Sequence, residues 1–408
     1  MSKVLKLTTG AETVSSDCWQ LIFNHLNNDE LKAISSVCKD FLAISNLVKK
    51  TLKVLHPNVH VLTKHLNRFT ELNKIDLSKF HGDLDKAIRA IARSELSLEA
   101  IDFCPEATFE AESLRELGSN PKMRNLKGLN CFLTKRLHDE DLAVIANSFP
   151  NLEELNVCRY DYDEKKNPSD YGVKILASKL RVLKKILISV KRNKLTDESI
   201  VALSLNCTFL KDVTIISNGD AKVTEHGIGL LLRNRPNLES LCIGKIEKDS
   251  TASSTITIEN SISHAKSLTF LTCHVMDISD ELLMEIGKAK LPLKNVELLD
   301  CRNFTVSGLR MVVSKHLNKL SIKGSDCEAD YGDIKLLLQR DVANLTHIEI
   351  SHSLVTSLNL YLLSTKFPSL EKLKISNVIL DDEASSPPSR KSLFPKGLIL
   401  LKNKGTNS

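Results

Sequence analysis

Residues of the types that bind metals occur in this chain, but not at the spacings that a metal site needs. His56 and His60 lie four residues apart, as two ligands on one helix can, yet Pro57 between them disfavours a helix interior and no third ligand lies nearby. The acidic run 161–164 lacks the glycine and the terminal glutamate of a calcium loop. We therefore expect no metal at either place.

Motifs of hydrolytic and nucleotide-binding enzymes are also missing from the sequence. It has no P-loop, no GxSxG elbow and no HExxH motif, and Gly227 with Gly229 are too few for a dinucleotide fingerprint. The ten cysteines are scattered without CxxC pairs, and Cys131 and Cys273 fall at core positions of expected strands. The sequence thus predicts a non-catalytic protein without cofactor or metal, with its cysteines as buried thiols.

The elements that would position any functional side chain follow from a repeated hexamer, leucine-x-x-apolar-x-apolar. Its first position recurs at a mean spacing of about 27 residues, inside the range of roughly 20–29 residues for leucine-rich repeats. The pattern predicts an α/β fold, a leucine-rich-repeat solenoid (horseshoe) of about twelve strand-helix repeats. The first positions are Leu72, Leu98, Leu126, Leu152, Leu183, Leu210, Leu238, Leu268, Leu293, Leu317, Leu345 and Leu370.

The hexamer also predicts which side chains face the core. Positions one, four and six should point inward and positions three and five outward, because strand side chains alternate between faces. Leu152, Leu155 and Val157 are thus expected in the core, and Glu154 and Asn156 on the surface. A helical period follows most strands. Several of these helices should begin at a hydroxyl N-cap before an acidic residue, namely at Thr196-Asp197, Thr224-Glu225 and Ser279-Asp280.

Charge and terminal sequences argue against nucleic acid and membrane as partners. A net charge of +6 is modest for 408 residues, whereas nucleic-acid-binding domains have pI values above about 9. The first 14 residues hold no apolar core of signal-peptide length, and the apolar stretch 398–401 is too short to span a bilayer. We expect an intracellular protein, cytoplasmic and/or nuclear.

The residues before Leu72 break the repeat and have a helical pattern instead. Trp19, Ile22, Phe23 and Leu26 form one apolar stripe behind the capping residues 15–17, and a second helical segment follows after residues 27–29. A bundle of about 40 residues buries little apolar surface and is marginal alone. We therefore expect this head to need a partner.

This helix-loop-helix resembles the F-box. Residues 37–41, Val-Cys-Lys-Asp-Phe, match the Val-Cys-basic-x-aromatic pattern of that family, and residues 17–23 look like F-box proteins of plants that carry leucine-rich repeats. With the repeats, the resemblance covers nearly the whole chain to about residue 380. It departs from the family at Val14-Ser15, where Leu-Pro is usual, and at Phe41, where tryptophan is usual.

The resemblance implies a non-catalytic substrate-recognition subunit of an SCF-type cullin-RING ubiquitin ligase. In that family the head docks on a Skp-family adaptor, and through it on cullin and RING proteins, while the repeats hold a target protein. The implied adaptor-binding residues are Val14, Trp19, Ile22, Phe23, Leu26, Leu31, Val37, Cys38 and Phe41. The target is expected on the concave face, at outward strand residues such as Glu154, Asn156, Phe270, Thr272, His274, Glu297, Lys319, Lys323, Glu349 and Lys374.

Alternatives remain open at this level. The chain fits a leucine-rich-repeat scaffold or inhibitor without ubiquitin machinery, whose head caps the first repeat, or a small-molecule co-receptor of the same superfamily. The outward strand positions carry mixed charge that leans basic in later strands. That charge fits either a solvated face or an acidic or phosphorylated partner.

The sequence also predicts domain boundaries. They are a flexible N-terminus 1–13, the F-box head 14–54, a connecting or capping segment 55–71, leucine-rich repeats 72–380, and a linker with a last capping strand and a tail 381–408. Repeats enlarged at 158–172 and 244–262 should form loops, either as tolerated surface length or as specificity loops.

Overall fold

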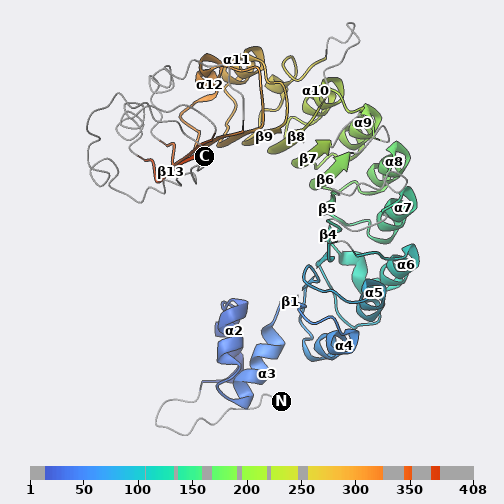
Figure 1. The fold of residues 1–408 in the computed structure, drawn as a ribbon. Helices are drawn as coiled ribbons and strands as arrows, with labels where there is room; N and C mark the ends of the chain where they lie inside the picture. The colour runs from blue at the N-terminus through green and yellow to red at the C-terminus, as the bar shows by residue number, and fades with distance from the viewer. Residues whose placement is uncertain are drawn as a thin grey trace, which may run out of the picture. The chain divides into compact units, whose positions relative to one another are not determined.

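The computed structural model describes residues 14–105, 107–132, 137–158, 168–190, 195–217, 222–246, 256–324, 344–351 and 369–376. It divides into two compact units, an N-terminal unit of residues 1–183 and a C-terminal unit of residues 184–408. Within each unit, short parallel strands alternate along the chain with helices, and the strands lie in one layer beside a layer of helices (Figure 1). This arrangement confirms the predicted α/β leucine-rich-repeat solenoid.

The N-terminal unit begins with the head, which we define as residues 14–48. It contains the helices α1 (Ser16–Phe23), α2 (Asn28–Ile34) and α3 (Lys39–Val48). Ser15 caps α1, because its hydroxyl accepts a hydrogen bond from the backbone N–H of Cys18. Asn27 and Glu30 form a capping box at α2, in which each side chain accepts a bond from the other's backbone N–H.

The repeats of the N-terminal unit continue from this head. Their strands are β1 (Thr51–Lys53), β2 (Lys74–Asp76), β3 (Ala100–Asp102), β4 (Gly128–Asn130) and β5 (Glu154–Val157). Their helices are α4 (Val59–Arg68), α5 (Leu84–Ala92), α6 (Ala111–Ser119), α7 (Asp139–Ser148) and α8 (Asp170–Lys179), with a 3-10 turn η1 (Pro121–Asn125).

The repeat pattern begins one repeat earlier than the hexamer predicts. β1 lies within the predicted head segment 14–54 and α4 within the predicted connecting segment 55–71. β1 pairs in parallel with β2, and Leu52 lies opposite Ile75. The hexamer misses this repeat because Lys49 occupies position one, where the later repeats have leucine.

The C-terminal unit has the same alternation. Its strands are β6 (Lys185–Val190), β7 (Asp212–Ser217), β8 (Ser240–Gly244), β9 (Phe270–His274), β10 (Asn295–Leu299), β11 (Lys319–Lys323), β12 (His347–Ser351) and β13 (Lys372–Ser376), each paired in parallel with the next. Its helices are α9 (Asp197–Asn206), α10 (Glu225–Asn234), α11 (Asp280–Ala289) and α12 (Val306–Val312), with a 3-10 turn η3 (Ile262–His264).

Burial follows the predicted alternation. In the repeat of β5, Leu152, Leu155 and Val157 are buried, whereas Glu154 is exposed and Asn156 is half-buried. Burying such leucine and valine side chains stabilises the fold by about 1.5–3 kcal/mol each. The predicted N-caps are also confirmed, since the side chains of Thr196, Thr224 and Ser279 each accept a backbone N–H at the start of a helix.

A recurrent carboxylate links neighbouring repeats, and we call it the acid clamp. The first residue of a helix accepts two hydrogen bonds, from the backbone N–H and the hydroxyl of the residue that caps the next helix, over 2.5–2.8 Å. Three residues after that cap stands a glycine, where a Cβ atom would overlap the carboxylate. The sets are Asp139 with Ser169 and Gly172, Asp197 with Thr224 and Gly227, and Asp280 with Thr305 and Gly308.

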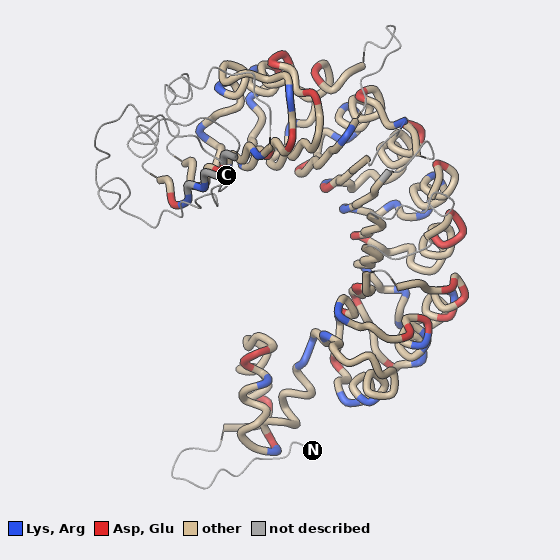
Figure 2. The backbone as a smooth tube through the Cα atoms, in the orientation of Figure 1, with Lys and Arg blue, Asp and Glu red and all other residues tan. Residues whose placement is uncertain are grey.

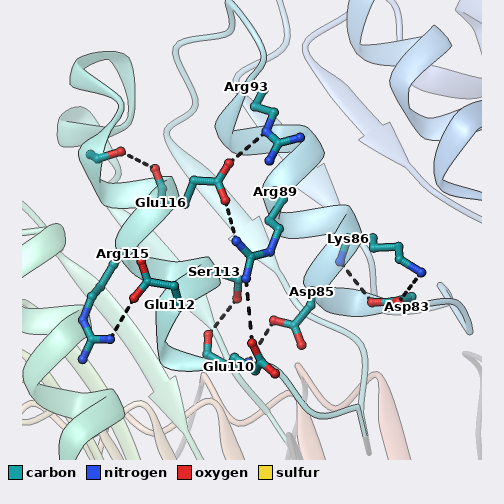
Figure 3. Close-up of polar contacts among 11 residues, drawn as sticks. Asp83, Asp85, Lys86, Arg89, Arg93, Glu110, Glu112, Ser113, Arg115 and Glu116 are labelled. Atoms are coloured by element: carbon teal, nitrogen blue, oxygen red, sulfur yellow. Dashed lines mark hydrogen bonds and ion pairs between the residues drawn. The ribbon is translucent and has the colours of Figure 1, made fainter.

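Ion pairs also join the helix layer. Glu116 of α6 accepts hydrogen bonds from Arg89 of α5 (2.7 Å) and from Arg93, which caps the end of α5 (2.9 Å) (Figure 3). Acidic and basic residues are interspersed along the helices of both units (Figure 2). Because solvent-facing pairs contribute about 0–1 kcal/mol each, the buried hexamer positions, rather than these pairs, hold the repeats together. None of the described helices is long and apolar enough to cross a membrane.

Candidate functional site

The head has an apolar core of its own. Phe23, Leu31, Ile44 and Val48 are buried there, and the half-buried residues Trp19, Leu26, Ile34 and Phe41 pack against them. The rings of Trp19 and Phe41 lie 4.9 Å apart and those of Phe23 and Phe41 5.2 Å apart. Two predicted adaptor contacts are therefore corrected. Phe23 and Leu31 lie inside the head, where the packing of its helices needs them, and they are not surface residues.

Other apolar side chains of the head face solvent. Of the thirteen exposed large apolar side chains in the described part of the chain, five belong to the head. We call these five residues the apolar head surface: Val14, Leu21, Ile22, Val37 and Leu47, of which Leu21 and Val37 are each 66% exposed. Exposed apolar side chains that gather on a small domain are typical of protein-interaction sites. Cys38, another predicted contact, is exposed as well.

Leu21 and Leu47 were not among the predicted contacts. Leu21 lies off the apolar stripe of α1. The helical period therefore places it on the solvent side and gives no sign that it contacts a partner. The signal that could have found both residues is a large apolar side chain on the polar side of an amphipathic helix. Three predicted contacts, Val14, Ile22 and Val37, do lie on the apolar head surface.

In the N-terminal unit, the two predicted target-binding residues of β5 differ in exposure and in hydrogen bonding. Glu154 is exposed. Asn156 is half-buried, and its side-chain oxygen accepts a hydrogen bond from the backbone N–H of Cys158 at 3.0 Å. Asn156 thus closes the turn after the strand, which leaves part of its side chain for other contacts.

In the C-terminal unit, the outward residues of β6 to β13 form rows, because the strands pair in register. We call this surface the strand face. One row runs through Ser240, Phe270, Asn295 and Lys319, and its neighbour contains Thr272 opposite Glu297. Phe270 is 43% exposed and stands between polar neighbours. This geometry suits an anchor for a partner side chain.

The charged residues of the strand face pair across strands. Glu297 bonds with Lys319, and Glu349 accepts bonds from Lys323 (3.0 Å) and Lys374 (2.7 Å). Although partial burial raises the pKa of Glu349, the hydrogen bonds from the two lysines outweigh it and lower that pKa overall. The predicted residues of β10 to β13 therefore form two groups of ion pairs, Glu297 with Lys319 and Glu349 with Lys323 and Lys374.

An open hollow of about 400 Å³ lies beside both groups. Its lining includes Lys319, His347, Glu349, Lys372 and Lys374. His274 is the last residue of β9. Burial lowers its pKa, whereas the negative charges of Asp300 and Glu297 act to raise it. The strand face thus combines an imidazole and an exposed phenyl ring with a lysine-rich hollow.

Of the residues considered for metal binding, the structure describes the two histidines. His56 precedes α4, where its Nδ1 accepts the backbone N–H of Asn58 at 3.1 Å, and His60 is exposed in the first turn of that helix. Within the described ranges, no group of three or more His, Cys, Asp or Glu side chains is arranged to hold a metal. The acidic run 161–164 and the expected last strand at 398–401 lie outside the described residues.

Comparison with known proteins supports the fold. No protein-family model matches the chain, and no curated protein matches it. Among solved structures, it is similar to a chain in the complex of Rad7 and Elc1 from yeast, with a TM-score of 0.55 and 14% identity over 95% of this chain and 92% of that chain. At this identity the likeness shows a common fold, and the chain is an α/β leucine-rich-repeat solenoid behind a small helical head.

Proposed function

We propose that the chain is a non-catalytic substrate-recognition subunit of an SCF-type ubiquitin ligase. The head docks on a Skp-family adaptor, which links it to cullin and RING proteins, and the repeats bind the target protein. The observation that carries this proposal is the apolar head surface. The head fills its core with other residues, so these five side chains are left for a partner to cover.

Two further findings support the adaptor contact. Residues 37–41 match an F-box pattern, and Val37 at the start of that pattern is among the most exposed apolar residues of the head. The solved structure to which the chain is similar contains Rad7 together with Elc1. A protein of this fold is therefore found there in a complex with a second protein, and we extend such an assembly to this chain.

The chain contributes proximity rather than bond chemistry. Holding a target lysine near a ubiquitin-charged enzyme converts an encounter between separate molecules into a reaction within one complex. The nucleophile and the leaving group belong to the target and to the partner enzymes.

The strand face is the target-binding surface in this proposal. Phe270 provides an apolar anchor, and the lysines around the hollow of β11 to β13 outnumber the acids that pair with them. Complementary charge would orient a target and speed its association. The surface therefore fits a target segment that places an apolar side chain near acidic residues.

The adaptor contact is tested by co-purification of the full chain with a Skp-family adaptor. Leu21→Asp and Val37→Asp should each weaken capture about tenfold or more, because each places a charge where about 1.5–3 kcal/mol of apolar burial is expected. The matched control is Phe209→Asp, which changes an apolar residue of comparable exposure in the C-terminal unit. It should leave capture unchanged.

Leu26 is a poorer choice for substitution because it packs against the head core. A change there would disturb the folding of the head as well as its docking. Circular dichroism melting should show that both head variants retain the wild-type fold. The proposal fails if wild type does not capture the adaptor where a known F-box protein does. It fails equally if Leu21→Asp and Val37→Asp bind as wild type does.

A further inference from the structure

Basic side chains gather where the head meets the first repeat, on residues that belong to neither the apolar head surface nor the strand face. Lys49 follows α3, and His65 and Arg68 lie on α4. All three stand around the buried ring of Phe69, with Lys49 Nζ 4.9 Å, Arg68 Cζ 5.2 Å and the His65 ring 5.8 Å from its centroid. Lys32 of α2 is close enough to act on the charge of Lys49. We call these four residues the basic cluster.

No carboxylate of the described residues pairs with the basic cluster. Burial, and then repulsion by Arg68 and Lys32, lower the pKa of Lys49, while burial, Arg68 and Lys49 lower that of His65. Among the described residues, none of the four forms an ion pair with a carboxylate. The nearby acid Glu71 bonds instead to Lys50, at 3.3 Å.

This arrangement contrasts with the rest of the N-terminal unit. Its other strand-associated lysines pair with acids on a neighbouring strand, as Lys53 does with Asp76 and Lys74 with Asp102. Lys49 stands at position one of its hexamer, where an apolar leucine would pack without any charge. A half-buried ammonium beside other cations is unfavourable for folding, and such positions are typical of binding sites.

The geometry is also suited to one kind of ligand. Arg68 Nε donates to the side-chain oxygen of Asn46 at 2.9 Å, which fixes the guanidinium plane and leaves its two terminal nitrogens for an acceptor. Both cations contact the ring of Phe69 by cation–π interaction. An anion with several oxygens beside the guanidinium and the ammonium would offset their mutual repulsion.

We propose that the basic cluster binds a phosphate monoester carried by a partner protein. A phosphoryl group has a charge of about −1.5 to −2 at neutral pH and three acceptor oxygens, which matches several clustered cations better than one carboxylate does. Its residues are not among those that we assign to the adaptor and the target. Binding there would make the partner's phosphorylation a condition for tight assembly.

The first test measures inorganic phosphate binding to the full chain. The ring signals of His65 are followed by NMR across pH, with and without phosphate, at constant ionic strength set by chloride. A bound dianion beside the imidazole should raise the pKa of His65 from its lowered value. If phosphate leaves the His65 titration unchanged, the proposal is overturned.

Variants distinguish a binding site from a merely structural cation–π cluster. Lys49→Met keeps the apolar stem in place but removes the charge, and should weaken phosphate binding about tenfold or more. The same variant should melt at a temperature no lower than wild type, because it relieves repulsion. Lys53→Met, which lies on the adjacent strand outside the cluster, is the matched control. Equal phosphate binding by wild type and Lys49→Met would refute the site.

The second test asks whether the phosphate is carried by protein. The probes are a five-residue peptide of phosphoserine flanked by alanines and its counterparts with serine and with glutamate. The phosphopeptide should bind at least as tightly as inorganic phosphate and more tightly than both counterparts. Two results would overturn the proposal that the phosphate is carried by a protein. One is that inorganic phosphate binds and the phosphopeptide does not; the other is that the glutamate peptide binds as tightly as the phosphopeptide. Neither result bears on capture of the adaptor by the head.

Discussion

At the scale of single residues, Asp280 illustrates how one carboxylate holds two repeats together. It accepts the backbone N–H and the hydroxyl of Thr305 at 2.8 and 2.6 Å. Both donors belong to the start of α12, where backbone N–H groups have no partner within the helix. The acid clamp therefore stabilises the later helix as well as the contact between repeats.

Replacing Asp280 by alanine should lower the free energy of unfolding by about 1–3 kcal/mol, because Thr305 loses a charged acceptor for two donors. Urea unfolding followed by circular dichroism measures this change. The control is Glu285→Ala, which removes the acid of an exposed pair with Lys288 on the same helix and should cost less than about 0.5 kcal/mol.

Gly308 supplies a second check on the same clamp. A Cβ atom there would overlap the Asp280 carboxylate. Gly308→Ala should therefore lower the free energy of unfolding more in the wild-type protein than in a protein that already carries Asp280→Ala. Additive effects in this double-mutant cycle would show that the carboxylate and the glycine do not act together.

At the scale of elements, the sequence predicts strands and helix starts well because both depend on local patterns. Leu152, Leu155 and Val157 face inward through strand alternation alone, and Thr196 caps its helix through its own side chain. β1 is missed because a single residue, Lys49, breaks the hexamer that marks the other strands. A pattern cannot show that a charged side chain fills a core position against an aromatic ring.

Contacts between residues far apart in the chain cannot be predicted from the sequence for a different reason. Phe23 and Leu31 belong to apolar stripes, and a stripe does not distinguish the head's own core from a surface for a partner. Only the packing of α1, α2 and α3 decides this. The bonds of Lys323 and Lys374 to Glu349 depend in the same way on strand register.

The pairing of β11, β12 and β13 predicts a pH effect. Since the pKa of Glu349 is lowered in the folded state, its ion pairs stabilise the fold above the unfolded-state pKa and lose that effect as pH falls. Glu349→Gln should therefore lose less stability than wild type between pH 7 and pH 3. Urea unfolding at both values tests this, with Glu371→Gln, at an exposed residue beside β13, as control.

At the scale of the whole molecule, each repeat packs mainly on its neighbours in sequence. Strands β6 to β13 pair only in chain order within the described residues. Stability in such an array is approximately a sum of repeats and the interfaces between them. Damage to one repeat should consequently spread to adjacent repeats first.

Leu241→Ala, in the core of β8, should cost about 2–5 kcal/mol by leaving a cavity. Hydrogen exchange should rise most in β7, β8 and β9 and least in β12 and β13. Leu205→Ala, at an exposed position of α9, is the control and should leave exchange nearly unchanged. A uniform rise across all strands would mean that the C-terminal unit opens as a single cooperative body.

The acid clamp also limits how repeats can be exchanged between proteins of this fold. Its carboxylate belongs to one repeat, whereas the capping hydroxyl and the glycine belong to the next, so the matched set crosses a repeat boundary. A chimaera joined between Asp197 and Thr224 would combine an acid from one parent with a cap and glycine from the other. A seam just after Gly227 would inherit the complete set from a single parent.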